Sequence, residues 1–276
     1  MIDFSPFPNN VGTILTNHSF DFYTTNSKFT LPIKTILRIY GIAGAGKGTL
    51  AQKLTNYFGI TNLETSYILR SATYIYQTLG LEFNDQSTDE VFDQIIIKLP
   101  NKNLQFFWNS KDKVKELTDL ELRSNIVQQN VSIYSGNPYF RAKYYNKINY
   151  ILNNLISSAV ILDGRGSNTP YLNQAEQDGF NIIRLFLWSN DEVNYNRYKS
   201  AYLIRHNLTL LNTDQEQVCY LEFQKNIVQR NLQDYDNAVA NNMGTLSQDT
   251  GIIDSSYLSP DQVFMTALNF IQLSVL

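Results

Sequence analysis

A glycine-rich loop, placed between a short apolar run and an amphipathic segment, constrains this chain more than any other feature. The loop covers residues 41–49 and has the sequence Gly-Ile-Ala-Gly-Ala-Gly-Lys-Gly-Thr. The preceding run, Ile36–Tyr40, is typical of a buried parallel strand. Apolar residues after the loop recur at helical spacing, which predicts a helix over residues 47–58 that ends at Gly59. Strand, glycine loop and helix in this order open an α/β fold.

The composition of this glycine loop (residues 41–49) is suited to binding phosphate groups. Glycines let backbone N–H groups approach phosphate oxygens without side-chain clashes, and the following helix directs its positive end to the same place. Lys47 stands where a lysine can reach the β- and γ-phosphates of a nucleotide. A strict pattern would place Ser or Thr at position 48, where this chain has Gly48 followed by Thr49. We interpret the loop as a nucleotide-binding site; the alternative is a glycine-rich turn without a ligand.

The rest of the chain continues the alternation of strands and helices. Further buried strands are predicted at residues 159–162, 182–187 and 251–254. Helices are predicted at residues 67–76 and 145–156, and another after Ser259, which can cap a helix together with Gln262. The alternation predicts an α/β fold, a doubly wound parallel sheet with helices on both faces.

Three segments depart from this pattern. Residues 95–99 and 104–108 flank a polar turn and predict a β-hairpin, the start of a small antiparallel sheet. Residues 199–214 are polar and lack strand signals, which is consistent with a mobile lid. Residues 1–34 carry no recognisable motif, although residues 20–23 could form a strand.

The composition argues against several classes of protein. The chain has 276 residues, of which 17% are charged, and a formal net charge of −3. Because it has no long basic run, we do not expect it to bind nucleic acid. A zinc site is not expected, since Cys219 is the single cysteine and His18 and His206 lie far apart, whereas Asp and Glu sites for Mg²⁺ remain open. A signal-peptide pattern is missing and no apolar run reaches about 18 residues, so we expect a cytoplasmic protein without a membrane span.

A second chemical motif follows one of the predicted strands. Residues 162–166 have the sequence Leu-Asp-Gly-Arg-Gly. An acid at the carboxyl end of a parallel strand lies where ligands bind in open α/β sheets. We predict that Asp163, with Thr49, holds Mg²⁺ through water and that Arg165 binds phosphate. Asp-Gly also commonly forms a turn at a strand end without a further role.

Several blocks make the chain, from about residue 36 to its C-terminus, similar to one known family. Residues 43–51 resemble the loop of the cytidylate kinase family (CMP/dCMP kinases), which are P-loop nucleoside-monophosphate kinases. Residues 63–70 are similar to the family's Leu-Asp-(Ser/Thr)-Gly-Ala-x-Tyr-Arg, with matches at Thr65 and Arg70. The departures in this block are Glu64, Ser66, Tyr67 and Leu69.

Two later blocks extend the resemblance. Residues 121–124 match the family's Glu-Ile-Arg segment, and the family pattern continues from there without a gap to residues 137–141. Residues 230–240 are similar to Arg-Asp-x-x-Asp-x-x-Arg-Ala-Val-Ala. Arg230 and Asp234 match and are one helical turn apart, so they can face the same cleft.

The resemblance implies phosphoryl transfer from ATP to a nucleoside monophosphate, with Mg²⁺ as the cofactor. The residues expected to bind ATP are Gly41, Ala43, Gly44, Ala45, Gly46, Lys47, Gly48 and Thr49. The residues expected to bind the acceptor are Thr65, Arg70, Ser132, Arg141 and Asp234. The expected catalytic set is Lys47, Asp163, Arg165, Arg197 and Arg230. Without the family blocks, Arg141 and Arg197 could equally be solvated surface arginines.

The resemblance also implies a division of the chain into a domain, a lobe and a lid. It implies a P-loop kinase domain over residues 35–276, with an acceptor-binding lobe inserted at residues 63–145 that includes the predicted hairpin. A lid is expected at about residues 190–235, and residues 1–34 remain an extension of unknown role.

Two positions depart from the family where its members read the pyrimidine base. Gly166 replaces an acid and Asn237 replaces an arginine. The substitutions imply a weaker choice among acceptor bases. Two alternatives stay open: a P-loop kinase with a non-nucleotide acceptor, and a nucleotide-binding regulatory module without turnover.

Overall fold

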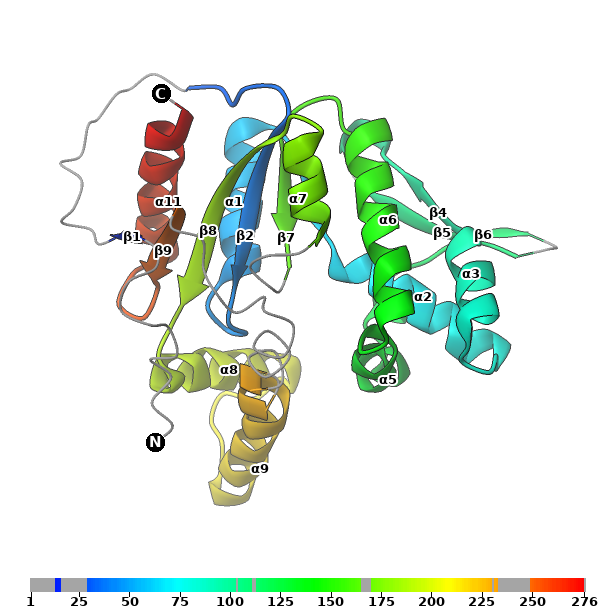
Figure 1. The fold of residues 1–276 in the computed structure, drawn as a ribbon. Helices are drawn as coiled ribbons and strands as arrows, with labels where there is room; N and C mark the ends of the chain where they lie inside the picture. The colour runs from blue at the N-terminus through cyan, green and yellow to red at the C-terminus, as the bar shows by residue number, and fades with distance from the viewer. Residues whose placement is uncertain are drawn as a thin grey trace.

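The centre of the molecule is a six-stranded parallel sheet. The computed structural model describes residues 13–15, 29–102, 104–110, 113–164, 170–229, 231–232 and 249–275. Within them the strand order is β1-β9-β8-β2-β7-β3, and every neighbouring pair is parallel (Figure 1). The strands are β1 (Thr13–Leu15), β2 (Thr35–Gly41), β3 (Thr61–Glu64), β7 (Val160–Asp163), β8 (Asn181–Trp188) and β9 (Thr250–Asp254). The predicted parallel α/β sheet is therefore confirmed.

Helices cover both faces of this sheet, because successive strand side chains point to opposite faces. On one face, α1 (Lys47–Phe58) and α11 (Pro260–Val275) pack against side chains such as Leu37 and Leu185. On the other, α6 (Pro138–Asn154) and α7 (Pro170–Gln177) pack against side chains such as Val160. Two apolar cores result, one on each face, as a doubly wound sheet requires.

The predicted ends of α1 and α11 are confirmed. Gly59 follows α1 with φ 63° and ψ 38°, and its N–H bonds to the Thr55 carbonyl. Only a residue that tolerates the left-handed region ends a helix in this way without strain. At α11, Gln262 N–H donates to Ser259 Oγ at 3.2 Å, and Ser259 N–H donates to Gln262 Oε1 at 2.8 Å, which completes the predicted capping box.

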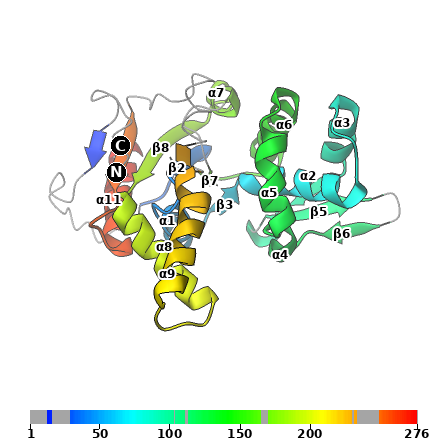
Figure 2. The same cartoon turned by 90° about the horizontal axis from the view of Figure 1, so that it is seen from below.

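The segment between β3 and α6 forms a separate layer beside the sheet (Figure 2). Its strands form an antiparallel sheet of order β4-β5-β6, so the predicted hairpin is confirmed and gains a third strand. The strands are β4 (Ile95–Lys98), β5 (Gln105–Asn109) and β6 (Val114–Glu116), with a 3-10 turn η1 (Pro100–Lys102) between the first two. The helices are α2 (Ser66–Leu79), α3 (Asp85–Asp93), α4 (Asp119–Leu122) and α5 (Asn125–Ser135).

A helical hairpin lies beyond the carboxyl ends of the strands (Figure 1). It consists of α8 (Asp191–Arg205) and α9 (Thr213–Phe223), and α9 continues into a π-helical turn, η2 (Gln224–Val228). Residues 199–214, predicted as a polar lid without strands, are therefore the end of α8, a connection and the start of α9.

The amino-terminal part of the chain contributes to the sheet. β1 pairs with β9 in parallel register, so residues 13–15 of the extension, whose role the sequence left unknown, form an edge strand of the sheet. Phe29 and Leu31 pack against the core formed with α1 and α11. The possible strand at residues 20–23 lies outside the described residues. Within the described part of the chain, no helix is long and apolar enough to cross a membrane.

The exit of the chain from β2 depends on a close backbone approach at Gly41. This residue has φ 138°, and a Cβ atom there would lie 2.8 Å from Leu187 N and closer still to the Leu187 carbonyl oxygen. Both the backbone conformation and the space exclude a larger residue.

We predict that Gly41→Ala lowers the free energy of unfolding by about 3 kcal/mol, through backbone strain and the clash with β8. Gly48→Ala is the control, because a Cβ there meets nothing within 4 Å and the backbone is helical. Urea unfolding followed by circular dichroism measures both variants. Equal unfolding midpoints for the two would contradict the prediction.

Candidate functional site

The glycine loop lies at the carboxyl edge of the sheet, between β2 and the start of α1. Gly44 and Gly46 adopt φ values of 87° and 90°, which turn the chain sharply before the helix. Gly46 is the N-cap residue, and the first turn of α1 contains no acidic residue. The amides of a first helical turn have no partner within the helix, and the helix dipole adds positive potential there. This arrangement suits an anion such as a phosphate group.

The Lys47 side chain folds back onto the glycine loop. Its ammonium group donates to the Ile42 carbonyl at 2.8 Å. It is also close enough to Asp163 to lower the pKa of that carboxyl group. Lys47 therefore connects the two motifs that the sequence predicted to act together.

Three separate segments form hydrogen bonds with the glycine loop. Ala43 N–H donates to Asn231 Oδ1 at 2.8 Å, beyond the end of α9. Arg197, on α8, donates through Nη1 to the Gly44 carbonyl at 3.3 Å. Ser255, which follows β9, donates through Oγ to the Ala45 carbonyl at 3.0 Å. Consecutive residues of the loop are thus fixed from outside.

Arg197 makes further contacts beside the loop. Its Nη2 donates to the Ser255 carbonyl at 2.7 Å and its Nη1 to Ser255 Oγ at 3.2 Å. A surface arginine without partners is therefore excluded, and the residue supports the loop. Asn194 lies on α8, one helical turn before Arg197, and packs against Gly44. A Cβ atom added at Gly44 would lie 2.7 Å from Asn194 Oδ1. Both residues link α8 to the glycine loop.

Asp163 ends β7 beside Glu64, its register partner at the end of β3. Its backbone carbonyl accepts hydrogen bonds from Thr65 N at 3.0 Å and Thr65 Oγ1 at 3.2 Å. Burial raises the pKa of the Asp163 carboxyl group, and the negative charge of Glu64 raises it further. Lys47 and Arg38 oppose these effects. The carboxylate is therefore kept at the edge of the sheet at a cost in desolvation.

The two residues predicted to hold Mg²⁺, Thr49 and Asp163, carry oxygen donors of the kind that this ion prefers. Thr49 is exposed in the first turn of α1, and Asp163 is a largely buried carboxylate. Among the described residues, no group of three or more His, Cys, Asp or Glu side chains could hold a metal ion directly. Mg²⁺ commonly keeps several waters and uses one or two carboxylates together with substrate phosphates.

Arg38 contacts the end of β7. It is not among the site residues that the sequence predicts. It is fully buried in β2, and its Nη1 donates to the Leu162 carbonyl at 3.0 Å. A Cβ at Gly164 would lie 3.1 Å from Arg38 Nη1 and 2.5 Å from Thr65 Oγ1. A side chain in place of Gly164 would therefore force Thr65 Oγ1 and the Arg38 guanidinium group to move. The sequence signal that could have identified Arg38 is its position as a charged residue within a largely apolar strand.

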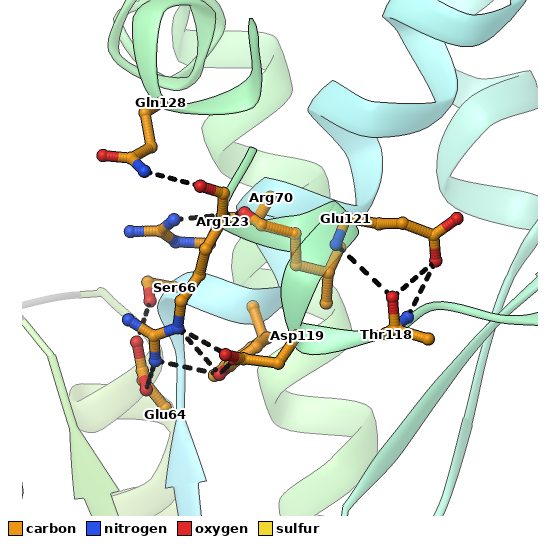
Figure 3. Close-up of polar contacts among 10 residues, drawn as sticks. Glu64, Ser66, Arg70, Thr118, Asp119, Glu121, Arg123 and Gln128 are labelled. Carbon is orange, nitrogen blue, oxygen red and sulfur yellow. Dashed lines mark hydrogen bonds and ion pairs between the residues drawn. The ribbon is translucent and has the colours of Figure 1, made fainter. Parts of the chain in front are cut away.

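The predicted acceptor residues lie on different elements of the neighbouring layer. Thr65 precedes α2, and Arg70 on α2 is buried and donates to the Leu122 carbonyl at 3.1 Å (Figure 3). Arg141 on α6 donates through Nε to the Ser135 carbonyl at 2.9 Å. Ser132 is exposed on α5. The helices α2, α5 and α6 pack against one another, which brings these residues into one layer.

Arg123 is the centre of an ionic network (Figure 3). It belongs to the family block at residues 121–124, but the sequence analysis predicts no role for it. It pairs with Glu64 Oε2 at 3.0 Å and with Asp119 Oδ1 at 2.8 Å, and it donates to the Tyr67 hydroxyl at 2.9 Å. Burial raises the pKa of Tyr67 to about 12, so the hydroxyl stays protonated and donates to Asp119. Ser66 Oγ donates to Glu64 Oε1 at 2.7 Å. The network joins β3, α2 and α4.

Several predicted residues lie outside the described part of the chain. They are Arg165, Gly166, Arg230, Asp234 and Asn237. Their roles remain predictions from the sequence.

We predict that Asp163→Asn raises the melting temperature at pH 7 by a few degrees. A carboxyl group whose pKa is raised on folding favours the folded state below its ordinary pKa, and this contribution is lost as the pH rises through the folded pKa. The neutral amide has no charge to desolvate on folding. The difference in melting temperature should therefore shrink when the pH falls towards 4, where Asp163 itself becomes neutral. Asp178→Asn is the control, since hydrogen bonds from Asn153 and Gln174 lower the pKa of Asp178. Calorimetry at both pH values that shows no gain for Asp163→Asn at pH 7 would contradict the prediction.

Comparison with known proteins assigns the chain to a family. The sequence model described as cytidylate kinase matches residues 37–273. Cytidylate kinase of Streptococcus pyogenes serotype M1 is 31% identical over 170 residues, covering 59% of this chain and 68% of that protein. The enzyme of Streptococcus suis (strain 05ZYH33) is 30% identical over 161 residues, covering 56% and 65%.

Solved structures resemble the chain more distantly. A gluconokinase from Sinorhizobium meliloti 1021 has a TM-score of 0.42 and 11% identity, covering 89% of this chain and 95% of its own. A sugar kinase from Janibacter sp. HTCC2649 has a TM-score of 0.40 and 12% identity, with 87% and 95% covered. The family match is independent of these structures and includes the glycine loop, Asp163 and the helical hairpin. The chain belongs to the cytidylate kinase family.

Proposed function

We propose that the protein transfers a phosphoryl group from ATP to a nucleoside monophosphate, with CMP and dCMP as the main acceptors. The observation that carries the proposal is the meeting of Lys47, the start of α1 and the buried Asp163 at one edge of the sheet. Family membership supports the reaction class. The base of the acceptor is inferred from the family alone.

Phosphoryl transfer mainly requires alignment of donor and acceptor and neutralisation of the charge on the transferring group. The amides at the start of α1 and the Lys47 ammonium group would bind the donor phosphates. Asp163 and Thr49 would hold Mg²⁺, which supplies positive charge to the donor phosphates when bound. The acceptor phosphate is itself the nucleophile, so the protein needs no covalent intermediate.

We assign the acceptor to the layer that contains α2, α5 and α6. Arg70 and Arg141 would contact its phosphate or base, and charge-assisted hydrogen bonds to such groups are strong. Thr65 and Ser132 complete the described set, and the sequence adds Arg165, Arg230 and Asp234. Residues 63–145 would form the acceptor lobe and residues 190–235 the lid. Closure of the two over the nucleotides would exclude water from the reacting phosphates.

We predict that Lys47→Ala lowers kcat about 100- to 1,000-fold, because it removes a preorganised positive charge from the transition state. Lys53→Ala, on the same helix, is the control, since Lys53 pairs with Asp261 at the start of α11. A coupled ADP-release assay with ATP, Mg²⁺ and CMP measures both. Near-normal kcat for Lys47→Ala would place the donor elsewhere.

We further predict weak discrimination among CMP, dCMP and UMP, or a shifted preference, instead of a sharp choice of cytosine. A site that hydrogen-bonds the substrate can discriminate by about 10,000-fold, whereas shape alone gives about 10- to 200-fold. Gly166 and Asn237 stand where the family has base-reading polar groups, so we expect the lower range. The measurement is kcat/KM for CMP, dCMP, UMP, dTMP, AMP and GMP, with the natural protein and with Gly166→Asp combined with Asn237→Arg. A preference of the natural protein for CMP over UMP above about 1,000-fold would refute it.

A further inference from the structure

Asn231 is a buried polar residue whose side chain reaches the glycine loop from another part of the chain. It is 8% exposed, and its Oδ1 accepts the hydrogen bond from Ala43 N–H at 2.8 Å. Ala43 is itself 7% exposed. The residue stands where the family block has Asp, beside the matching Arg230 of the sequence. None of the roles proposed above uses it.

The hydrogen bond fixes the direction of the loop. A buried N–H group without a partner is costly, so the loop is favoured in the conformation that points Ala43 N–H at Asn231. Arg197 and Ser255 hold the next two carbonyls, those of Gly44 and Ala45. Three consecutive loop residues just before the start of α1 are therefore held by other parts of the chain.

The π-helical turn η2 precedes Asn231 in the chain. An α-helix advances about 100° per residue, and a π-helical turn holds more residues per turn than an α-helix. A π-helical turn therefore changes the direction in which later side chains of a helix point, compared with an uninterrupted α-helix. Such turns occur often at functional sites. Here the turn ends at Val228, three residues before Asn231, which contacts the glycine loop.

We propose that Asn231 is a positioning residue that couples the α8–α9 hairpin to the glycine loop, so that the loop has its phosphate-binding shape only while the hairpin is docked. Asn in place of the family's Asp keeps the hydrogen-bond acceptor without placing a negative charge beside anionic phosphates. The proposal rests on the proposed function for the identity of the ligand, ATP.

The test compares three variants in two measurements. Asn231→Leu removes the acceptor at similar volume, Asn231→Ala removes it without bulk, and Asn231→Asp retains it. Asn226→Leu is the matched control, because Asn226 lies in η2 and donates to the Tyr198 hydroxyl at 3.2 Å. The first measurement is the Kd for a fluorescent ATP analogue. The second is kcat, with separate KM values for ATP and acceptor, for every variant that melts as a folded protein.

We expect Asn231→Leu and Asn231→Ala to weaken ATP binding about 10-fold, the effect of one lost buried hydrogen bond, and to leave the acceptor KM unchanged. Asn231→Asp should bind ATP more tightly than both. The control should bind as the natural protein does. Unchanged ATP affinity in the folded Leu or Ala variant would overturn the proposal, and so would equal losses in the Asp variant and the Leu or Ala variant.

The two measurements separate this proposal from the proposed function. If the natural protein binds ATP but phosphorylates none of the nucleoside monophosphates, the proposed acceptor class is wrong. The ATP-binding comparison still decides the role of Asn231 in that case. If the natural protein does not bind ATP, both fail together.

Discussion

The close contact between the backbones of β2 and β8 at Gly41 determines where the site can form. Ile42 N–H donates to the Leu187 carbonyl at 3.2 Å, and the space at Gly41 admits no side chain. The chain therefore leaves the sheet at one point and in one direction. Because α1 starts only a few residues later, its first turn lies at the carboxyl edge, near Asp163. The donor site follows from strand register and from one glycine.

The site depends on charges held at a desolvation cost that their partners only partly offset. Burial favours the neutral form of Asp163, and Glu64 on the adjacent strand adds to this. Lys47 and Arg38 act in the opposite direction. A buried charge is tolerated only with such partners. The carboxylate and the lysine are thus coupled before any nucleotide binds, and the fold accepts a loss of stability where the chemistry is expected.

Local features of this chain are predictable from its sequence, whereas contacts between distant segments are not. The predicted helix over residues 47–58 begins and ends where the structure has α1. Both signals used, the spacing of apolar residues and the glycine that follows the helix, are local in the sequence. The short strand β3 is missed because Leu63 is the one apolar residue among its four. Helix α4 is also missed, although Thr118 and Glu121 form a capping box that a search could find. Asn231 reaches the glycine loop from 188 residues away, and no local pattern encodes that pair.

The two arginines inside the sheet show how charge is distributed around this edge. Arg38 on β2 and Arg184 on β8 are register partners, an arrangement that like charges disfavour. Arg184 is neutralised by Glu176 at 2.5 Å and Asp249 at 3.0 Å, one from each side. Arg38 bonds instead to the Leu162 carbonyl and faces the turn after Asp163. Arg38 therefore lies at the strand end, where its positive charge lowers the pKa of Asp163.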